Sequence, residues 1–167
     1  MLFLKFQLGD EVCALEAGQI VEVLQLLTVT RIVQAPAGIA GLIDYRGEPV
    51  PVIDLSQLAL GRPARPHIST RLIVVRYAAT HLLGLIVERA TDTLRREAQE
   101  FIDTGITWDA APSLGLVARD SGQLIRRIDI QKLLPAALGN ALFRAVDPAA
   151  CSAAMEDACP TTPSPLS

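Results

Sequence analysis

One pattern occurs twice in this chain, and it limits the folds that the chain can adopt. Residues 41–60 read GLIDYRGEPVPVIDLSQLAL and residues 115–134 read GLVARDSGQLIRRIDIQKLL, an offset of 74 that becomes 75 after one inserted residue, Ser121. Upstream, residues 3–24 match residues 73–94 at an offset of about 70. Two copies of one unit predict two similar subdomains related by a pseudo-two-fold axis, each curled into a small barrel that removes its strand edges.

Short strands are expected throughout both halves, so the fold class is mainly β. Leu4, Phe6 and Leu8 alternate with polar residues, which is the period of a half-buried strand. Because only 4% of the residues are aromatic, Val, Ile, Leu and Ala must fill the core. The further expected strands, bounded by turn residues, are 11–17, 20–26, 39–45, 48–53, 71–77, 81–87, 90–95, 114–119 and 124–128.

Helix is expected at few places. Asp54 predicts an N-cap for a helical turn over residues 55–60, and Asp129 is its counterpart in the second copy. For both acids the capping role is a stronger interpretation than paired acid–base catalysis. A further helical turn is expected at residues 17–19, and a C-terminal helix with a break near Pro135 closes the fold.

The domain organisation follows from the repeat and from the loop-forming segments. Residues 1–146 are expected to form a single domain with one subdomain over 1–66 and a second over 67–146, joined through the Pro- and Gly-rich segment 61–70. Residues 147–167 contain four prolines among small and polar residues, which predicts a disordered tail.

The two copies differ most at the turn and in the strand that follows it. Pro49 and Pro51 are two residues apart, so their missing N–H groups lie on one side of the strand. This strand is therefore expected at an edge or a rim, and prevention of edge-to-edge aggregation alone would explain the prolines. Arg46 at the turn is matched with Asp120 in the second copy, which indicates that the first rim is specialised.

Composition argues against nucleic-acid and membrane partners. The formal charge is −3 and the arginines are scattered, so the chain has no basic footprint for nucleic acid. No stretch approaches the roughly 20 apolar residues that span a bilayer. We therefore expect an intracellular, soluble protein without direct membrane insertion.

No catalytic, cofactor or metal motif is evident, which predicts binding without chemistry. His67 and His81 belong to no recognisable nucleophile motif, and the glycines form no phosphate-binding loop. Cys13 lies in an apolar strand pattern and is expected to be a buried hydrophobic residue. Cys151 and Cys159 have no histidine nearby, and a zinc site needs about four ligands. We expect no enzyme activity, no cofactor and no metal.

The repeated segments resemble the CheW family of chemosensory coupling proteins. The resemblance extends over roughly residues 2–134, and its most specific element is an Arg-Gly turn followed by a Pro-Val-Ile-Asp-Leu strand. The turn usually reads Asn-Leu-Arg-Gly in the family, whereas here it reads Asp44-Tyr45-Arg46-Gly47. The resemblance implies two SH3-like five-stranded barrels, in which strands can be exchanged between the halves.

The resemblance also implies a function. Family members are cytoplasmic adaptors, recruited to membrane-bound receptor arrays, that connect the signalling tip of a methyl-accepting chemotaxis receptor to the regulatory domain of a histidine kinase. Several segments, including MLFLKFQLG and LIVERATDTL, are most similar to Wsp-type coupling proteins of a surface-sensing pathway. A generic protein-interaction module, a fragment of the kinase itself and a small-barrel nucleic-acid binder are the alternatives.

By resemblance, two groups of residues carry the candidate interfaces. The expected receptor-binding residues are Ile20, Glu22 and Val23, with Ile20 and Val23 in an apolar groove between the barrels. The turn and partner interface comprises Gly41, Asp44, Tyr45, Arg46 and Gly47, and the kinase is expected to bind near Leu42–Gly47 or its counterpart in the second copy. A guanidinium at an apolar rim favours a carboxylate partner, so Arg46 is expected to pair with Glu22 in preference to Asp44 or Glu48, or else to remain in solvent.

Overall fold

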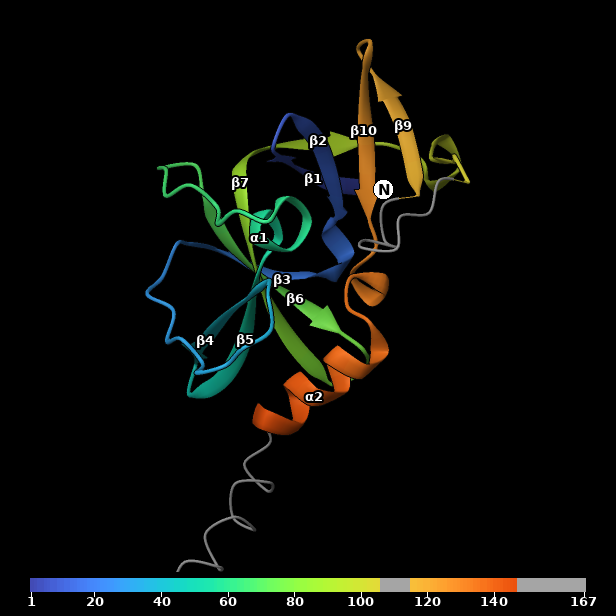
Figure 1. The fold of residues 1–167 in the computed structure, drawn as a ribbon. Coiled ribbons are helices and arrows are strands. Elements are labelled where there is room, and N and C mark those ends of the chain that lie inside the picture. Colours follow the sequence, from blue (N-terminus) through green and yellow to red (C-terminus); the bar gives the residue numbers. More distant parts are fainter. Residues whose placement is uncertain (106–114, 147–167) are drawn as a thin grey trace, which may run out of the picture.

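The computed structural model describes residues 1–105 and 115–146, and within them the chain is mainly β, as the sequence predicted (Figure 1). The elements follow in the order β1 (Leu2–Leu8), β2 (Glu11–Glu16), η1 (Ala17–Gln19), β3 (Ile20–Gln25), β4 (Ile39–Tyr45), β5 (Glu48–Asp54), α1 (Leu55–Leu60), β6 (Arg71–Tyr77), β7 (His81–Arg95), η2 (Ala98–Glu100), β8 (Ile102–Asp103), β9 (Leu116–Asp120), β10 (Gln123–Ile128), η4 (Ile130–Lys132) and α2 (Ala136–Val146).

The strands form two barrels that exchange strands between the halves of the sequence. In barrel I, β1 pairs with β2 and with the second half of β7. β2 also pairs with β10, which pairs with β9, and β9 pairs with β8. In barrel II, β6 pairs with β3 and with the first half of β7. This half of β7 also pairs with β5, which pairs with β4. The halves divided at residue 66 therefore do not correspond to the two barrels.

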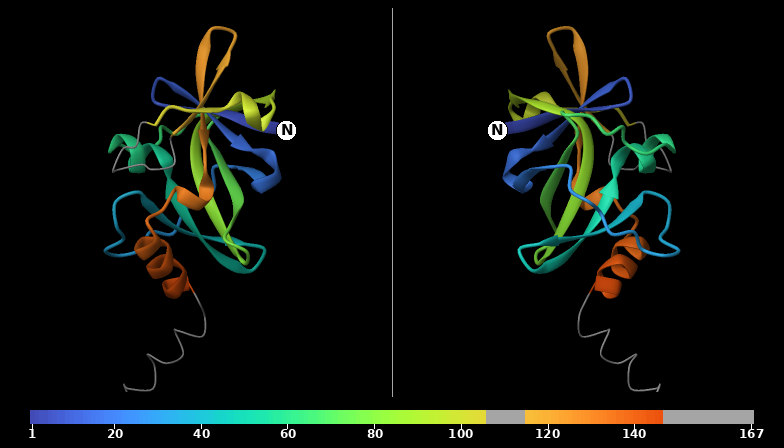
Figure 2. Two further views of the ribbon diagram at one scale, coloured as in Figure 1. Left: turned by 90° about the vertical axis from the view of Figure 1, so that its right-hand side faces the viewer. Right: turned by 90° about the vertical axis from the view of Figure 1, so that its left-hand side faces the viewer.

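Two of the pairings between the halves are parallel, and they are equivalent in the two barrels. Val52 of β5 lies opposite Gly84 of β7, and Ile125 of β10 lies opposite Val12 of β2, whereas the other strand pairs are antiparallel. In each barrel a hairpin from one half of the sequence accepts a strand from the other half. Figure 2 shows the β9–β10 hairpin and α2 at opposite ends of the molecule.

β7 is one continuous strand of 15 residues, where the sequence predicted two separate strands. Residues 81–87 pair with β6, and residues 88–95 pair with β1, so the strand passes from one barrel into the other. The change falls at Arg89, which has a φ of 49°. This left-handed conformation bends the strand without ending it.

The turn of the second copy corrects the alignment of the repeat. Ser121 and Gly122 have positive φ, as Arg46 and Gly47 do, so the two-residue turns coincide at an offset of 75. Ser121 is therefore the counterpart of Arg46, and the prediction that Asp120 holds this place was wrong. The error arose because the extra residue was placed at the turn, whereas the two hairpins pair in the same register, at an offset of 75, from Leu116 to the turn.

Three apolar clusters stabilise this arrangement. β6 is buried on both faces, because Leu72 and Val74 point into barrel II while Ile73 and Val75 point toward barrel I. A second set of residues fills barrel I around Phe3. The third cluster lies between the barrels and is the largest: it contains Phe6, Leu8, Cys13, Leu15, Ile53, Leu55, Ile73, Val75, Leu83, Leu85, Val87, Ala90, Ile128, Ile130, Leu133, Leu134 and Leu142.

The prolines of β5 occupy the part of the strand that has one neighbour. Pro49 and Pro51 lie opposite residues of β4, whereas pairing with β7 begins only at Val52. The prediction of an edge is thus correct for residues 48–51, and it is wrong for the end of the strand, which lies between β4 and β7. Proline lacks the N–H that a second neighbour would require.

The helical predictions are confirmed where the structure describes them. The Asp54 carboxylate accepts a hydrogen bond from the Gln57 backbone N–H at 3.1 Å and caps α1. Asp129 caps η4 by accepting one from the Gln131 backbone N–H at 3.0 Å. Pro135 separates η4 from α2. The strand β8 was not predicted, and the tail over residues 147–167 lies outside the described residues. Neither described α-helix is long and apolar enough to cross a bilayer.

Candidate functional site

The turn Arg46-Gly47 connects β4 to β5 and has a defined geometry. Tyr45 pairs with Glu48, and the two residues between them have φ values of 54° and 84°, which is the pattern of a type I′ hairpin turn. The Asp44 carboxylate accepts a hydrogen bond from the Gly47 N–H at 2.8 Å. Asp44 therefore stabilises the turn, and the Arg46 side chain projects from it.

Glu22 joins this turn to β3, and the predicted ion pair is present. Nη2 of Arg46 lies 3.0 Å from Oε2 of Glu22, and the same oxygen accepts a hydrogen bond from the Tyr45 hydroxyl at 2.5 Å. The Arg46 guanidinium also lies 5.1 Å from the centroid of the Tyr45 ring. Three residues from two strands thus form one cluster, although the Arg46 side chain remains 74% exposed.

The cluster holds Tyr45 in its neutral form. The hydrogen bond to Glu22 is the largest cause, followed by burial, and together they raise the pKa of the Tyr45 hydroxyl above its ordinary value. Arg46 opposes this increase through its positive charge. Tyr45 therefore remains a hydrogen-bond donor that fixes the Glu22 carboxylate beside Arg46.

β3 presents one face to solvent beside this cluster. Its burial alternates, so Val21 and Val23 are 38% and 43% exposed, whereas Ile20 packs against the central apolar cluster. Ile20 and Val23 therefore lie on opposite faces of the strand. The expected apolar groove lined by both residues between the barrels was wrong, because the central cluster fills that space.

Gly41 supports the turn from within the barrel and is itself buried. Its φ is 145°, and a Cβ at this position would lie 2.0 Å from the Thr30 carbonyl oxygen. Thr30 and Leu42 exchange two backbone hydrogen bonds of 2.8 Å each. Glycine is required here because the segment at Thr30 crosses β4 in close contact, and no side chain fits between the two backbones.

The segment after β3 forms a groove that the sequence did not predict. A cavity of about 590 Å³ lies against residues 26–40, with contributions from α1 and from Ile86 of β7. Leu26 and Leu27 are exposed beside it. The sequence signal was present, because residues 26–40 are rich in apolar side chains, but the Pro-Gly pattern suggested only a break.

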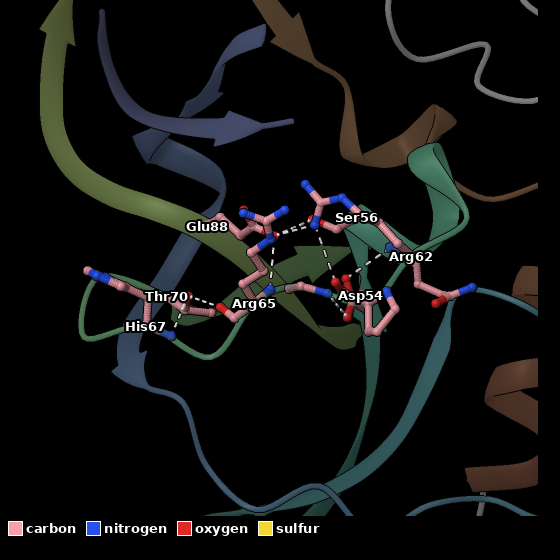
Figure 3. Close-up of polar contacts among 10 residues, drawn as sticks. Asp54, Ser56, Arg62, Arg65, His67, Thr70 and Glu88 are labelled. Atoms are coloured by element: carbon pink, nitrogen blue, oxygen red, sulfur yellow. Dashed lines mark hydrogen bonds and ion pairs between the residues drawn. The ribbon is translucent and has the colours of Figure 1, made fainter. Parts of the chain in front are cut away.

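A polar network orders residues 61–70, which the sequence identified only as a loop or linker (Figure 3). The Glu88 carboxylate accepts hydrogen bonds from Arg62 Nη1 at 3.0 Å and from the Arg65 backbone N–H at 2.9 Å. Asp54 accepts one from the Ala64 N–H at 2.8 Å. Although burial of Glu88 would raise its pKa, these hydrogen bonds outweigh it, and the pKa lies below the ordinary value.

Among the described residues, the titratable groups show no arrangement typical of a catalytic site. Cys13 is fully buried as predicted, and burial raises the pKa of its thiol to about 12, so the reactive thiolate does not form. His81 stacks on Phe143 with the ring centroids 4.3 Å apart. Across residues 1–105 and 115–146, no group of three or more His, Cys, Asp or Glu side chains is placed to hold a metal ion.

The amino-acid sequence of this chain is similar to one family of known proteins. The family model described as CheW-like domain matches residues 2–138. The chain is 25% identical to the chemotaxis protein CheW of Rhizobium meliloti (strain 1021), covering 78% of this chain and 84% of that protein. It is 28% identical to the protein FrzA of Myxococcus xanthus, covering 85% and 90%.

A solved structure shows the same fold. The crystal structure of the scaffolding protein TtCheW from Thermoanaerobacter tengcongensis superposes with a TM-score of 0.72 at 23% identity. The superposition covers 81% of this chain and 88% of that protein. The two-barrel architecture expected from the sequence is thereby confirmed.

Proposed function

Because the chain belongs to the CheW-like domain family, we propose that it is a non-enzymatic adaptor, coupling a methyl-accepting chemotaxis receptor to a histidine kinase. The observation that carries this proposal is the exposed cluster of Glu22, Tyr45 and Arg46, which joins two strands at the surface of barrel II. A charged cluster fixed by a neutral tyrosine offers a partner a defined pattern of charge and hydrogen bonds. An adaptor needs such surfaces and requires no reacting group.

The receptor tip is assigned to the outer face of β3. Val21 and Val23 supply exposed apolar side chains, Glu22 lies between them in sequence, and Leu26 and Leu27 extend the apolar surface toward the groove. A helical receptor segment docks through apolar residues spaced three and four apart, and this surface offers exposed apolar side chains to such residues. Ile20 contributes from behind, by fixing β3 to the central cluster.

The kinase regulatory domain is assigned to a separate surface at a barrel end, because an adaptor holds both partners at once. The turns at Arg46-Gly47 and Ser121-Gly122 are equivalent in position, but their neighbours differ. Asp120, beside the second turn, pairs with Arg96 and lies 3.7 Å from Lys5. Duplication therefore provides two related ends with different charges, as binding to two different partners requires.

The finer assignment to a Wsp-type pathway at membrane-bound receptor arrays rests on sequence resemblance. A nucleic-acid function has less support, because both tyrosine rings, which lie among the described residues, are engaged within the protein and are not free for base stacking. Tyr45 is buried against Glu22, and Tyr77 stacks on Phe143 at 5.2 Å.

Charge reversal at Arg46 tests the proposal. Arg46→Glu should weaken binding to the receptor tip or the kinase by about tenfold, equivalent to about 1.4 kcal/mol. The variant should remain folded with only a small change in the thermal melt, because an exposed ion pair contributes little to stability and a turn residue buries little apolar area. Arg76→Glu reverses another exposed arginine and should bind both partners normally. Binding would be measured by titration calorimetry with purified receptor and kinase fragments.

A double variant separates recognition from local structure. Arg46→Glu combined with Glu22→Arg restores an ion pair but exchanges its two charges. Recovery of binding would mean that the pair only stabilises the turn, whereas persistent loss would mean that a partner reads the charges. Normal binding of a folded Arg46→Glu variant to both partners would contradict the assignment.

A further inference from the structure

A second concave site lies where the two barrels meet, and it shares no residue with the Glu22–Tyr45–Arg46 cluster. This junction cleft has a volume of about 560 Å³. One wall comes from β1 and the β1–β2 turn of barrel I, and the opposite wall comes from the loop 61–70, with β7 between them. Its polar lining includes Gln7, Asp10, Arg62, Arg65, Thr70 and Arg89.

The loop wall of the cleft is held in place before any ligand binds. Glu88 and Asp54 accept three hydrogen bonds from Arg62, Arg65 and Ala64, as described above. The Thr70 hydroxyl donates to the Arg65 carbonyl oxygen at 2.6 Å, which closes the loop on itself. A wall fixed by so many contacts loses little conformational freedom when it binds a ligand.

Two guanidinium groups in the cleft have no carboxylate partner within the described part of the chain. Arg62 pairs with Glu88 at 3.0 Å, but among the described residues no carboxylate lies within 4.0 Å of the Arg65 or Arg89 side chain. The lining of the cleft holds three guanidinium groups, of Arg62, Arg65 and Arg89, and two carboxylates, of Asp10 and Glu88. It therefore has an excess of one positive charge, although the whole chain carries −3.

The backbone at Arg89 adds an independent observation. Its φ of 49° is unfavourable for any residue other than glycine, and Arg89 lies inside a continuous strand. The flanking residues explain how it is held: Glu88 binds the loop, and the Ala90 N–H donates to the Ser69 carbonyl oxygen at 3.1 Å. The strained residue is thus an arginine that lines the cleft, where glycine would have been easier to accommodate.

We propose that the junction cleft binds a phosphate monoester. Arg65 and Arg89 offer two planar sets of N–H donors, which match the terminal oxygens and the charge of a phosphate dianion. Asp10 disfavours additional negative charge and accepts a hydrogen bond from a hydroxyl or amine in the rest of the ligand. The phosphate belongs either to a small phosphorylated metabolite or to a phosphorylated residue of a partner protein.

Titrations of the full chain with three probes test this proposal. The probes are inorganic phosphate, AMP and a phosphoserine peptide, each added at constant ionic strength and followed by amide chemical shifts in NMR spectra. We expect shifts confined to residues 7–10, 62–70 and 88–90. Tighter binding of AMP than of the peptide would indicate a metabolite, and the reverse order would indicate a phosphorylated protein.

Two variants and a matched control make the test decisive. Arg65→Ala and Arg89→Gly should each weaken phosphate binding by about tenfold, whereas Arg119→Ala, at an exposed arginine of β9, should change it by less than about twofold. Arg89→Gly should remain at least as stable as the wild type in urea, because glycine adopts a positive φ without strain. If Arg89→Gly does not fold, Arg65→Ala carries the test.

Three results would overturn the proposal. The first is the absence of shifts in the cleft with all three probes, and the second is equal binding by the wild type and both variants. The third is binding that Arg119→Ala weakens as much as Arg65→Ala does, which would indicate general attraction to arginine. Because the cleft is separate from the Glu22–Tyr45–Arg46 cluster, none of these results would affect the proposed adaptor function.

Discussion

Replacement of Gly41 by alanine should destabilise the chain strongly, although it adds a single methyl group. Two terms contribute. The φ of 145° costs an alanine about 1–3 kcal/mol. The new Cβ would lie 2.0 Å from the Thr30 carbonyl oxygen, so the backbones must separate and lose both hydrogen bonds between Thr30 and Leu42. At about 0.5–1.5 kcal/mol for each bond, the total loss is about 2–6 kcal/mol.

Gly47→Ala is the matched control for this prediction. Gly47 has a φ of 84°, but no atom lies within 4 Å of the position where its Cβ would be, so only the backbone term applies. Urea unfolding followed by circular dichroism should therefore show that Gly41→Ala is less stable than Gly47→Ala by about 1–3 kcal/mol. Equal losses in the two variants would refute the close backbone contact at Thr30.

Two further predictions concern titratable groups. The hydrogen bonds to Glu88 lower its pKa in the folded state, so its contribution to stability is present at neutral pH and is lost as the pH falls through that lowered value. Thermal melts of Glu88→Gln should therefore change less than those of the wild type on acidification below about pH 4.3, and an identical acid dependence would contradict this role. Burial raises the pKa of Cys13 to about 12, so in a Cys151→Ser, Cys159→Ser background the thiol should not react with a disulfide reagent at about pH 8 until urea unfolds the chain. Rapid reaction of the folded protein would show that Cys13 is accessible.

The sequence was sufficient for local features and for the duplicated architecture. Alternation of apolar and polar residues located most strands, and the helical turn after Asp54 followed from its capping side chain. The charge and position of Arg46 were enough to predict its pairing with Glu22. These features depend on neighbouring residues or on simple charge complementarity.

Features that depend on long-range pairing were not predictable from the residues alone. Because the two halves of the sequence are alike, the local pattern does not specify which hairpin β5 joins, so the parallel pairing of β5 with β7 was not predicted. The continuity of β7 depends on Arg89 adopting a positive φ, which is unfavourable for an arginine and is therefore not expected from its sequence. The Tyr45 hydrogen bond to Glu22 was missed because it requires the tertiary arrangement of β3 and β4.

The central claim is that this chain holds a receptor and a kinase at the same time. The most direct measurement is co-sedimentation of a membrane-anchored receptor fragment with the purified kinase, with and without the chain. The adaptor account predicts that the kinase sediments with the receptor only when the chain is present, and that Arg46→Glu reduces its recovery while Arg76→Glu does not. Competition between the two partners for the chain, or sedimentation of the kinase in its absence, would contradict the account.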